Sequence, residues 1–281
     1  MAREAIPLLI TGGTGRIGGA LRQNWPWMMR GGLRPIWQSR QPRPGYLTWD
    51  VLDAACPSLA QGGIVLCLAG GRGCSEEAQT ALALAACEAA GRHVFVMSSA
   101  AVYGDPGPDP VAEDAPLRPV SEYGRAKSAM EAAVCSWHSA QGKAAPGLTI
   151  LRLGNVAGFD ALLGAAPTGV PVQLDPISGQ TGGPVRSYIG PGTLSAVLAR
   201  LVTLAAKGDA LPQVLNIAAP CPVSMAGLLE AAGMTWAFGP ERPEAIARVA
   251  LNTALLQSLV KFPPPASHPA AMVSEWQGSL R

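Results

Sequence analysis

Charged residues are scarce in this chain of 281 residues. Asp, Glu, Lys and Arg together make up 14% of it, and 21 basic against 19 acidic residues give a formal net charge of +2. The basic residues are scattered along the chain, whereas nucleic acids and anionic membranes are bound by basic clusters. We therefore expect no nucleic-acid or membrane partner, and a small molecule as the ligand.

Metal motifs, signal peptides and membrane spans are also missing. The six cysteines form no CxxC pair and do not combine with the three histidines at the spacing of a metal site. We expect buried free thiols, no bound metal and a reducing compartment. The stretch "AIPLLITGG" follows the N-terminus almost at once, and no later run is long enough to span a bilayer. The sequence thus predicts a cytoplasmic protein.

Apolar residues make up 48% of the sequence, and in the first half short apolar runs alternate with helical patterns. This alternation is typical of βαβ units and a parallel sheet. We expect buried strands over residues 6–11, 34–38, 64–68, 93–98, 148–153 and 214–217. We expect helices over residues 17–24, 75–90, 122–140 and 193–206. The predicted fold class is α/β, a doubly wound parallel sheet of the Rossmann type with a small C-terminal substrate lobe.

The domain organisation follows from the same alternation. Residues 1–157, with 184–219 returning to them, form the predicted dinucleotide-binding domain. Residues 158–183 and 220–281 are rich in Pro and Gly and lack the alternation. They form the predicted substrate lobe.

A glycine-rich stretch, "LLITGGTGRIGGAL", stands where the first strand turns into the first helix. Gly13, Gly15 and Gly18 fit the motif GxGxxG. Gly12, Gly15 and Gly18 fit the variant in which two residues separate successive glycines. Without Cβ atoms, the backbone can approach a pyrophosphate, whose charge meets the N-terminus of the helix. The alternative is a glycine-rich turn in a chain with 33 glycines. The residues predicted to hold the cofactor here are Gly12, Gly13, Thr14, Gly15, Arg16, Ile17 and Gly18.

The second strand lacks the acidic residue that would bind the adenosine ribose of NAD. The sequence there is "IWQSRQPR", which offers Ser39, Arg40 and Arg43. A guanidinium fork beside a hydroxyl suits a 2′-phosphate, so we predict NADP as the preferred cofactor, with NAD as the other candidate. The alternative is that both arginines are ordinary solvated loop charges.

Tyr123 and Lys127 stand four positions apart in "VSEYGRAKSAM". An unperturbed phenol titrates near pH ~10, and a lysine one helical turn further on lies on the same face and lowers its pKa. The pair can therefore act as an acid/base couple, or it can be two polar residues on the exposed face of a helix. The upstream stretch "HVFVMSSAAVYG" favours the first interpretation, because it is a strand ending in hydroxyls at the ligand-binding edge of the sheet.

The segments TGGTGRIG, SSAAVYG and YGRAK, in this order and spacing, resemble the extended short-chain dehydrogenase/reductases, the NAD(P)-dependent sugar-nucleotide epimerase/dehydratase family. The resemblance covers nearly the whole chain. It implies that Tyr123 is the general acid/base, that Ser99 binds the same substrate oxygen, and that Lys127 holds the nicotinamide ribose and lowers the tyrosine pKa. Ser98 is the alternative to Ser99 for this role, and we expect it to be structural.

The same resemblance extends to shorter segments. "YLTWDV" implies adenine contacts from Asp50 and Val51, although an Asp that begins a turn would look the same. "CLAGG" resembles the loop under the cofactor, with Leu68, Ala69 and Gly70. "LRLGNVAG" implies a substrate contact from Asn155. The segments "PVRSYIGPGTLS" and "ERPEAIARVALNTALL" imply that Arg186 and Arg242 grip a nucleotide diphosphate. Surface arginines without such a role are equally common.

Some positions depart from the family pattern. Ala100 and Ala101 replace the Asp-Glu pair with which family dehydratases eliminate water, which disfavours dehydration. Gly190 to Thr193 replace a pair of acids, and the segment 158–183 is short, so the substrate lobe is reduced.

Three functions are compatible with these patterns. The first is an NAD(P)-dependent oxidoreductase or epimerase acting by hydride transfer at a hydroxyl or ketone of a sugar-nucleotide-like substrate. The second is a carbonyl reductase for a small hydrophobic substrate, and the third a non-catalytic NADP-binding sensor or scaffold. The stretch "ALALAACEAA" leaves the helix over 75–90 little polar surface, and the resemblance implies that this helix and the one over 122–140 pair with a second copy into a homodimer. A helix buried within one chain would look the same.

Overall fold

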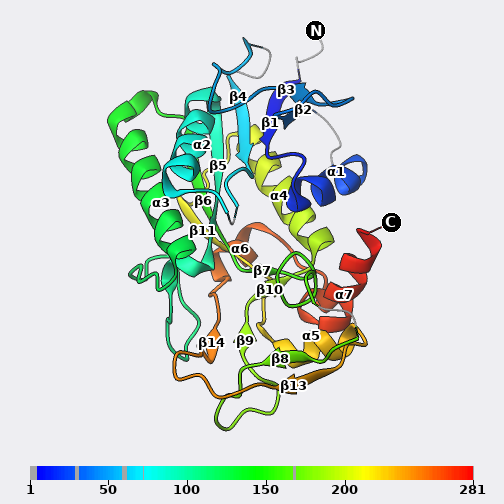
Figure 1. The fold of residues 1–281 in the computed structure, drawn as a ribbon. Coiled ribbons are helices and arrows are strands. Elements are labelled where there is room, and N and C mark those ends of the chain that lie inside the picture. The colour runs from blue at the N-terminus through cyan, green and yellow to red at the C-terminus, as the bar shows by residue number, and fades with distance from the viewer. Residues whose placement is uncertain (1–4, 29–31, 59–61, 72, 167–168, 281) are drawn as a thin grey trace.

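The computed structural model describes residues 5–28, 32–58, 62–71, 73–166 and 169–280 (Figure 1). Its centre is a seven-stranded sheet in the order β11-β6-β5-β4-β1-β2-β3, in which every neighbouring pair is parallel. The chain adds β2 and β3 on one side of β1 and the later strands on the other side. This reversal confirms the predicted doubly wound fold. The strands are β1 (Ile6–Thr11), β2 (Leu33–Ser39), β3 (Leu47–Thr48), β4 (Gly63–Cys67), β5 (Ala90–Ser99), β6 (Gly147–Leu153) and β11 (Val214–Ile217).

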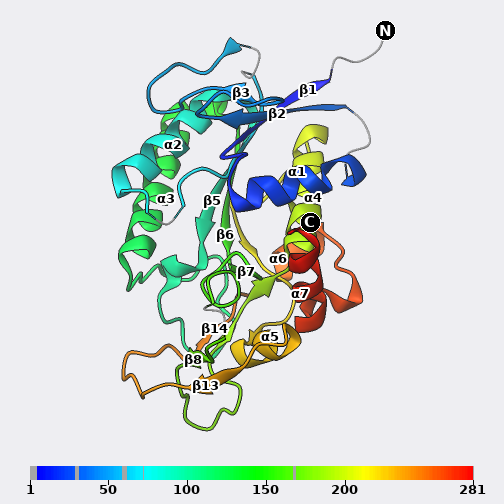
Figure 2. The same cartoon turned by 45° about the vertical axis from the view of Figure 1, so that its right-hand side comes forward.

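Four helices cover the two faces of the sheet. Figures 1 and 2 show α1 and α4 together on one face and α2 and α3 on the other. Each helix begins and ends within a few residues of its predicted bounds. The bounds are α1 (Arg16–Met28), α2 (Glu76–Ala89), α3 (Glu122–Gln141) and α4 (Pro191–Lys207).

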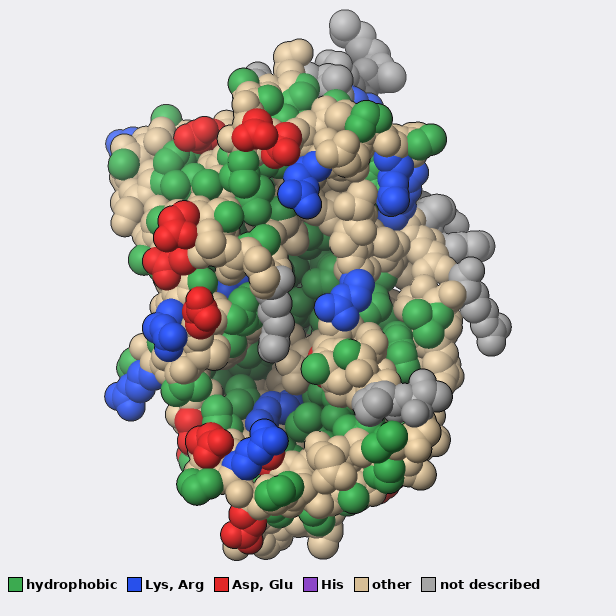
Figure 3. All heavy atoms as spheres, in the orientation of Figure 1, with side chains coloured by type: hydrophobic (Ala, Val, Ile, Leu, Met, Phe, Trp, Pro, Cys, Tyr) green, Lys and Arg blue, Asp and Glu red, His purple; other side chains and the backbone are tan. Residues whose placement is uncertain are grey.

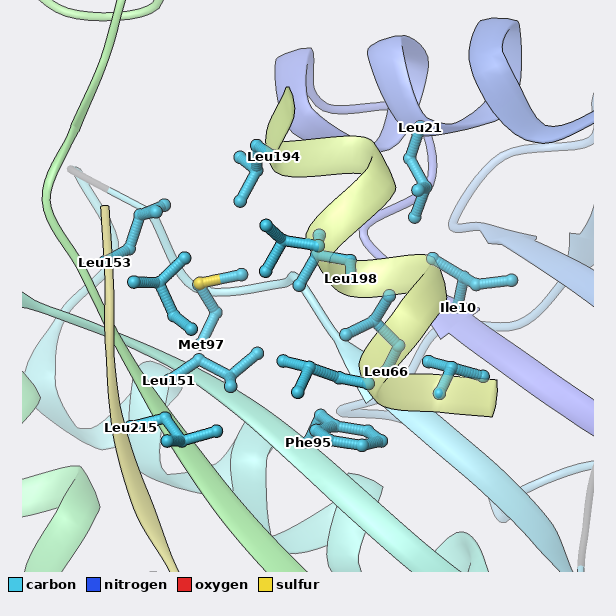
Figure 4. Packing of buried hydrophobic residues seen from close by; sticks show 14 of the residues in the cluster. Ile10, Leu21, Leu66, Phe95, Met97, Leu151, Leu153, Leu194, Leu198 and Leu215 are labelled. Carbon is cyan, nitrogen blue, oxygen red and sulfur yellow. The ribbon is translucent and has the colours of Figure 1, made fainter. Parts of the chain in front are cut away.

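The core forms two layers because successive side chains of a strand point to opposite faces. In β5, Phe95 and Met97 face α1 and α4, and Figure 4 shows them with Leu198 of α4. Val94 and Val96 face the layer under α2 and α3. All of these side chains are buried, which explains why the strands have near-continuous apolar runs.

The lobe consists of short strands and helices around a smaller core. Its sheets have the orders β10-β7, β12-β9-β14 and β13-β8. Many of these strands are only two residues long, too short for alternation to be read from the sequence. The elements are β7 (Asn155–Val156), β8 (Val172–Leu174), β9 (Val185–Arg186), β10 (Tyr188–Ile189), β12 (Val223–Ser224), β13 (Trp236–Phe238), β14 (Arg248–Val249), α5 (Met225–Ala231), α6 (Ala254–Leu259) and α7 (Pro269–Gly278).

The division into domain and lobe stays a prediction. Leu256 and Val260, from the predicted lobe, pack into the core of the seven-stranded sheet, so the two parts share apolar contacts. The predicted ranges also include residues outside the described part of the chain, namely 1–4, 29–31, 59–61, 72, 167–168 and 281.

Two further expectations concern cysteines and membranes. Cys67 and Cys87 are buried free thiols, whereas Cys74 and Cys221 are exposed, which corrects the expectation that the thiols are buried. Within the described ranges, no helix combines the length and the apolar character that crossing a bilayer requires.

Candidate active site

A cleft of about 1040 Å³ runs along the carboxyl ends of the central strands. Figure 3 shows this face hollowed between the sheet and the lobe, with hydrophobic side chains on the floor and Lys and Arg side chains along the rim. The cleft brings together most of the residues predicted from the sequence. Those that line it are Gly12, Thr14, Gly15, Arg16, Ile17, Gly18, Ser39, Arg40, Arg43, Asp50, Val51, Leu68, Ala69, Gly70, Ser99, Tyr123, Lys127 and Asn155.

The glycine loop forms a cradle with no room for side chains. Gly12 has φ +69°, and a Cβ on it would lie 2.8 Å from the backbone N of Ala69. A Cβ on Gly18 would lie 2.6 Å from the carbonyl oxygen of Gly12, so the helix packs directly on the turn. Gly13 is not among the lining residues, and a Cβ on it would lie 3.1 Å from the carbonyl oxygen of Gln38. A backbone held this close at a helix N-terminus fits the pyrophosphate of a dinucleotide.

Gln38 braces this cradle from the end of β2. Its side chain is buried, accepts a hydrogen bond from Gly12 N at 2.9 Å and donates one to the carbonyl of Trp49 at 2.6 Å. These two contacts tie the glycine loop to the segment after β3. We did not single out Gln38 from the sequence, although a polar residue inside a buried apolar run is a usable signal.

The predicted adenosine end of the cleft carries the basic residues. Ser39 is buried and its hydroxyl donates to the carbonyl of Gln41 at 2.8 Å, which leaves its oxygen as an acceptor. Arg40 is exposed, and the guanidinium carbon of Arg43 lies 5.7 Å from the ring centroid of Tyr46. Two guanidinium groups therefore border the position at which an acid would bind the ribose hydroxyls of NAD.

Asp50 and Val51 border the cleft on the same side. Asp50 Oδ1 accepts a hydrogen bond from Leu52 N at 3.2 Å, so this carboxylate also shapes a turn. Val51 is buried. Both interpretations offered by the sequence for Asp50, a cofactor contact and a turn residue, are therefore compatible with its position.

Tyr123 and Lys127 lie one turn apart on α3, and both line the cleft together with Ser99 at the end of β5. A Cβ on Gly124 would lie 2.5 Å from the carbonyl oxygen of Ala101. Only glycine permits this close approach of α3 to the segment after β5. The approach brings the turn of α3 that carries Tyr123 against the segment that follows Ser99.

Lys127 is fully buried, with an exposed fraction of 1%. Its Nζ donates to the carbonyl of Met97 at 2.9 Å, and burial lowers its pKa. The Ser99 hydroxyl accepts from Ala101 N at 3.2 Å, a bond that does not use its proton. A fixed ammonium and an available hydroxyl proton are what a phenol needs beside it to exchange protons with a substrate oxygen.

A buried polar network connects this wall to the sheet behind it. The Ser98 hydroxyl donates to Glu131, one turn beyond Lys127 on α3, and Glu131 pairs with Arg152 of β6 at 2.8 Å. Arg152 also donates to the hydroxyl of Tyr103 at 2.9 Å. The network fixes α3 against β5 and β6. It was not predicted from the sequence, because each pairing joins segments that are distant in the chain.

Arg186 and Arg242 do not line the cleft. The Arg186 guanidinium donates to the carbonyls of Val185 at 2.9 Å and Ile246 at 2.7 Å, and burial lowers its pKa. Arg242 has a side chain that is 63% exposed, and its Nε lies 3.6 Å from a carboxylate oxygen of Asp175. Arg186 is therefore hydrogen-bonded to backbone carbonyls, and Arg242 is paired with an acidic side chain.

Residues 75–168, which include Ser99, Tyr123 and Lys127, match the NAD dependent epimerase/dehydratase family. The matched residues are about a third of the chain. UDP-glucose 4-epimerase of Corynebacterium glutamicum is 44% identical to it over 61 residues, which are 22% of this chain and 18% of that protein. The aligned stretch is thus a small part of the curated relative.

Several solved structures have the same fold over almost their whole length. MoeE5, in complex with UDP-glucuronic acid and NAD, matches with a TM-score of 0.73 and 23% identity over 98% of this chain and all of that one. UDP-glucose 4-epimerase from Bifidobacterium longum, in complex with NAD+ and UDP, matches with a TM-score of 0.73 and 18% identity over 97% and 98% of the two chains. At these identities the likeness establishes the fold.

Proposed function

We propose that this protein is an NAD(P)-dependent epimerase or oxidoreductase that acts at a hydroxyl or ketone of a sugar-nucleotide-like substrate. The observation that carries the proposal is the convergence of the glycine cradle, Ser99, Tyr123 and Lys127 on one cleft. The family match and the NAD and sugar-nucleotide ligands named for similar structures support this assignment.

A bound nicotinamide dinucleotide would supply the hydride acceptor or donor. Tyr123 takes the proton of the substrate hydroxyl as the C–H hydride leaves, and returns a proton to the oxygen when hydride comes back. Ser99 donates a hydrogen bond to the same oxygen. Lys127, whose charge favours the phenolate, lowers the cost of the proton transfer. Return of hydride to the opposite face of the ketone would give an epimer.

The test of this function is turnover of nucleotide sugars. The protein is incubated with NAD or NADP and with UDP-glucose or UDP-galactose, and products are separated by chromatography while reduced nicotinamide is followed by absorbance. An epimer or an oxidised sugar supports the proposal. Cofactor binding with no turnover of nucleotide sugars or ketones would favour the sensor or scaffold.

A carbonyl reductase is the second candidate, because the far end of the cleft is mainly apolar. Val156, Phe159, Ala161 and Ala165 line it. A reductase of this kind would oxidise NADPH with small hydrophobic ketones and leave UDP-sugars unchanged. The same absorbance assay therefore separates the two functions.

We propose NADP as the preferred cofactor, from the position of Ser39 and Arg40 at the end of β2. NADPH should bind at least several-fold tighter than NADH, and Arg40→Asp should reverse the order, because the guanidinium that pairs with a 2′-phosphate becomes an acid that repels it. Fluorescence titration measures both affinities. Arg92→Asp, an equal charge change at an exposed residue outside the cleft lining, is the control. Tighter binding of NADH to the unmodified protein would refute the preference.

We also propose a homodimer formed through α2 and α3. This helix pair leaves small residues exposed, namely Ala81 and Ala132, and leaves Leu84 and Trp137, which pack against the core, only half-buried. A second copy of the pair would cover this side with a four-helix bundle. Light scattering at micromolar concentration should give twice the 28.9 kDa mass of the chain. A mass of one chain would contradict the dimer.

A further inference from the structure

The end of the cleft away from the glycine cradle contains an acid that the sequence did not mark. Asp160 lines the cleft beside Asn155 and Phe159, in the loop after β7. Among the described lining residues, the other acid is Asp50, near the basic residues of the predicted adenosine end. Asp160 is therefore the acidic group among the described residues at the end that a substrate would occupy.

Two fixed contacts orient the carboxylate of Asp160. The hydroxyl of Tyr188, a fully buried side chain of β10, donates to Oδ2, and the backbone N of Leu163 donates to Oδ1 at 3.3 Å. Tyr188 is in turn hydrogen-bonded by the side chain of Asn155. Tyr188 thus lies behind the cleft and connects Asn155 and Asp160, which both line it.

Burial affects the protonation of both Tyr188 and Asp160. Burial raises the pKa of Tyr188 well above its ordinary value, so the phenol keeps its proton and remains the donor to Asp160. Burial also raises the pKa of Asp160, while its hydrogen bonds oppose the rise. A carboxylate has about four acceptor positions, and the two contacts leave some of them for a ligand.

We propose that Asp160 is a specificity-determining residue that selects a neutral, hydroxyl-bearing glycosyl group and disfavours an acidic one. The inference rests on the proposed function. A sugar hydroxyl donates to the carboxylate, whereas a second carboxylate at the same place meets a like charge. Among the described lining residues, the basic ones lie elsewhere: Arg16 begins α1, Arg40 and Arg43 follow β2, and Lys127 is on α3, so none of them belongs to the loop that carries Asp160.

A purely structural role predicts a different outcome. If Asp160 only closes the turn to Leu163 and anchors Tyr188, its replacement lowers stability without changing which ligand binds better. The ratio of two ligand affinities is therefore the deciding quantity, since a general loss of stability leaves a ratio unchanged.

The experiment is calorimetric titration of the NADPH-saturated protein with UDP-glucose and UDP-glucuronic acid, the two sugar nucleotides named in complexes of MoeE5. The unmodified protein should bind UDP-glucose at least about tenfold tighter, the scale of a hydrogen bond to a charged group. Asp160→Asn should reduce this ratio of affinities by about tenfold.

Tyr188→Phe is the control variant. It removes the neighbouring donor but keeps the carboxylate, so the preference for UDP-glucose should persist. NADPH affinity reports that the cleft of each variant is folded, and Asp160→Ser serves if the Asn variant fails this check.

An unchanged ratio in the folded Asp160 variant, or a wild-type preference for UDP-glucuronic acid, would overturn the role of Asp160 and leave the proposed function standing. Failure of UDP, UDP-glucose and UDP-glucuronic acid to bind at all would instead reject the sugar-nucleotide substrate class, and the inference with it.

Discussion

Turnover falls by about a hundredfold or more when Tyr123 is replaced by Phe, if the phenol carries the proton as proposed. The substitution keeps the ring and removes only the titrating hydroxyl. Cofactor affinity should stay within about twofold, because the proposed cofactor contacts of Lys127 and the glycine cradle are untouched. The measurement is kcat on the substrate identified by the product assay, together with the dissociation constant of the reduced cofactor.

Lysine variants provide the matched control for this result. Lys127→Met should lower both kcat and cofactor affinity, because the buried ammonium is proposed to hold the ribose and to stabilise the phenolate. Lys143→Met removes the same charge from an exposed residue just beyond α3 and should change neither. Full turnover by the Tyr123 variant would mean that the Tyr-Lys pair is not an acid/base couple.

Replacing Glu131 with Ala should lower the free energy of unfolding by about 3–5 kcal/mol, the usual cost of removing one partner of a buried ion pair. The side chains of Glu131 and Arg152 are only 5% and 7% exposed, so water cannot compensate the guanidinium left behind. The Ser98 hydroxyl also loses its acceptor. Urea denaturation followed by far-UV circular dichroism measures the change.

Glu122→Ala is the control for this prediction, since Glu122 is an exposed acid in the first turn of the same helix. Its loss should cost no more than about 1 kcal/mol, the value of a charge at a helix N-terminus. If the Glu131 variant were no less stable than the Glu122 variant, the buried network would not hold α3 in place.

The sheet and the glycine cradle were predictable because local sequence determines them. The apolar runs of residues 6–11 and 214–217 coincide with β1 and β11, since strands covered on both faces need continuous apolar side chains. The glycine spacing likewise reflects a local requirement, because Gly12 and Gly18 have no space for a Cβ. The spacing of Tyr123 and Lys127 follows from the helical repeat alone.

The remaining features depend on contacts between distant segments. Glu131 and Arg152 are 21 residues apart, and nothing local in the sequence indicates that they pair. The lobe shows the same limit, because Arg186 donates to a carbonyl 60 residues away, and the resemblance alone did not reveal this contact. Asp160 was overlooked for the same reason, since its partner Tyr188 lies 28 residues further along the chain.

The most direct test of the central claim is titration of the unmodified protein with NADPH and NADH. Energy transfer from tryptophan to the reduced nicotinamide is the signal that reports binding. The account predicts one saturable site per chain for a reduced dinucleotide, displaced by NADP or NAD, because the glycine cradle and the proposed catalytic residues line one cleft. Absence of saturable binding of either dinucleotide would contradict it.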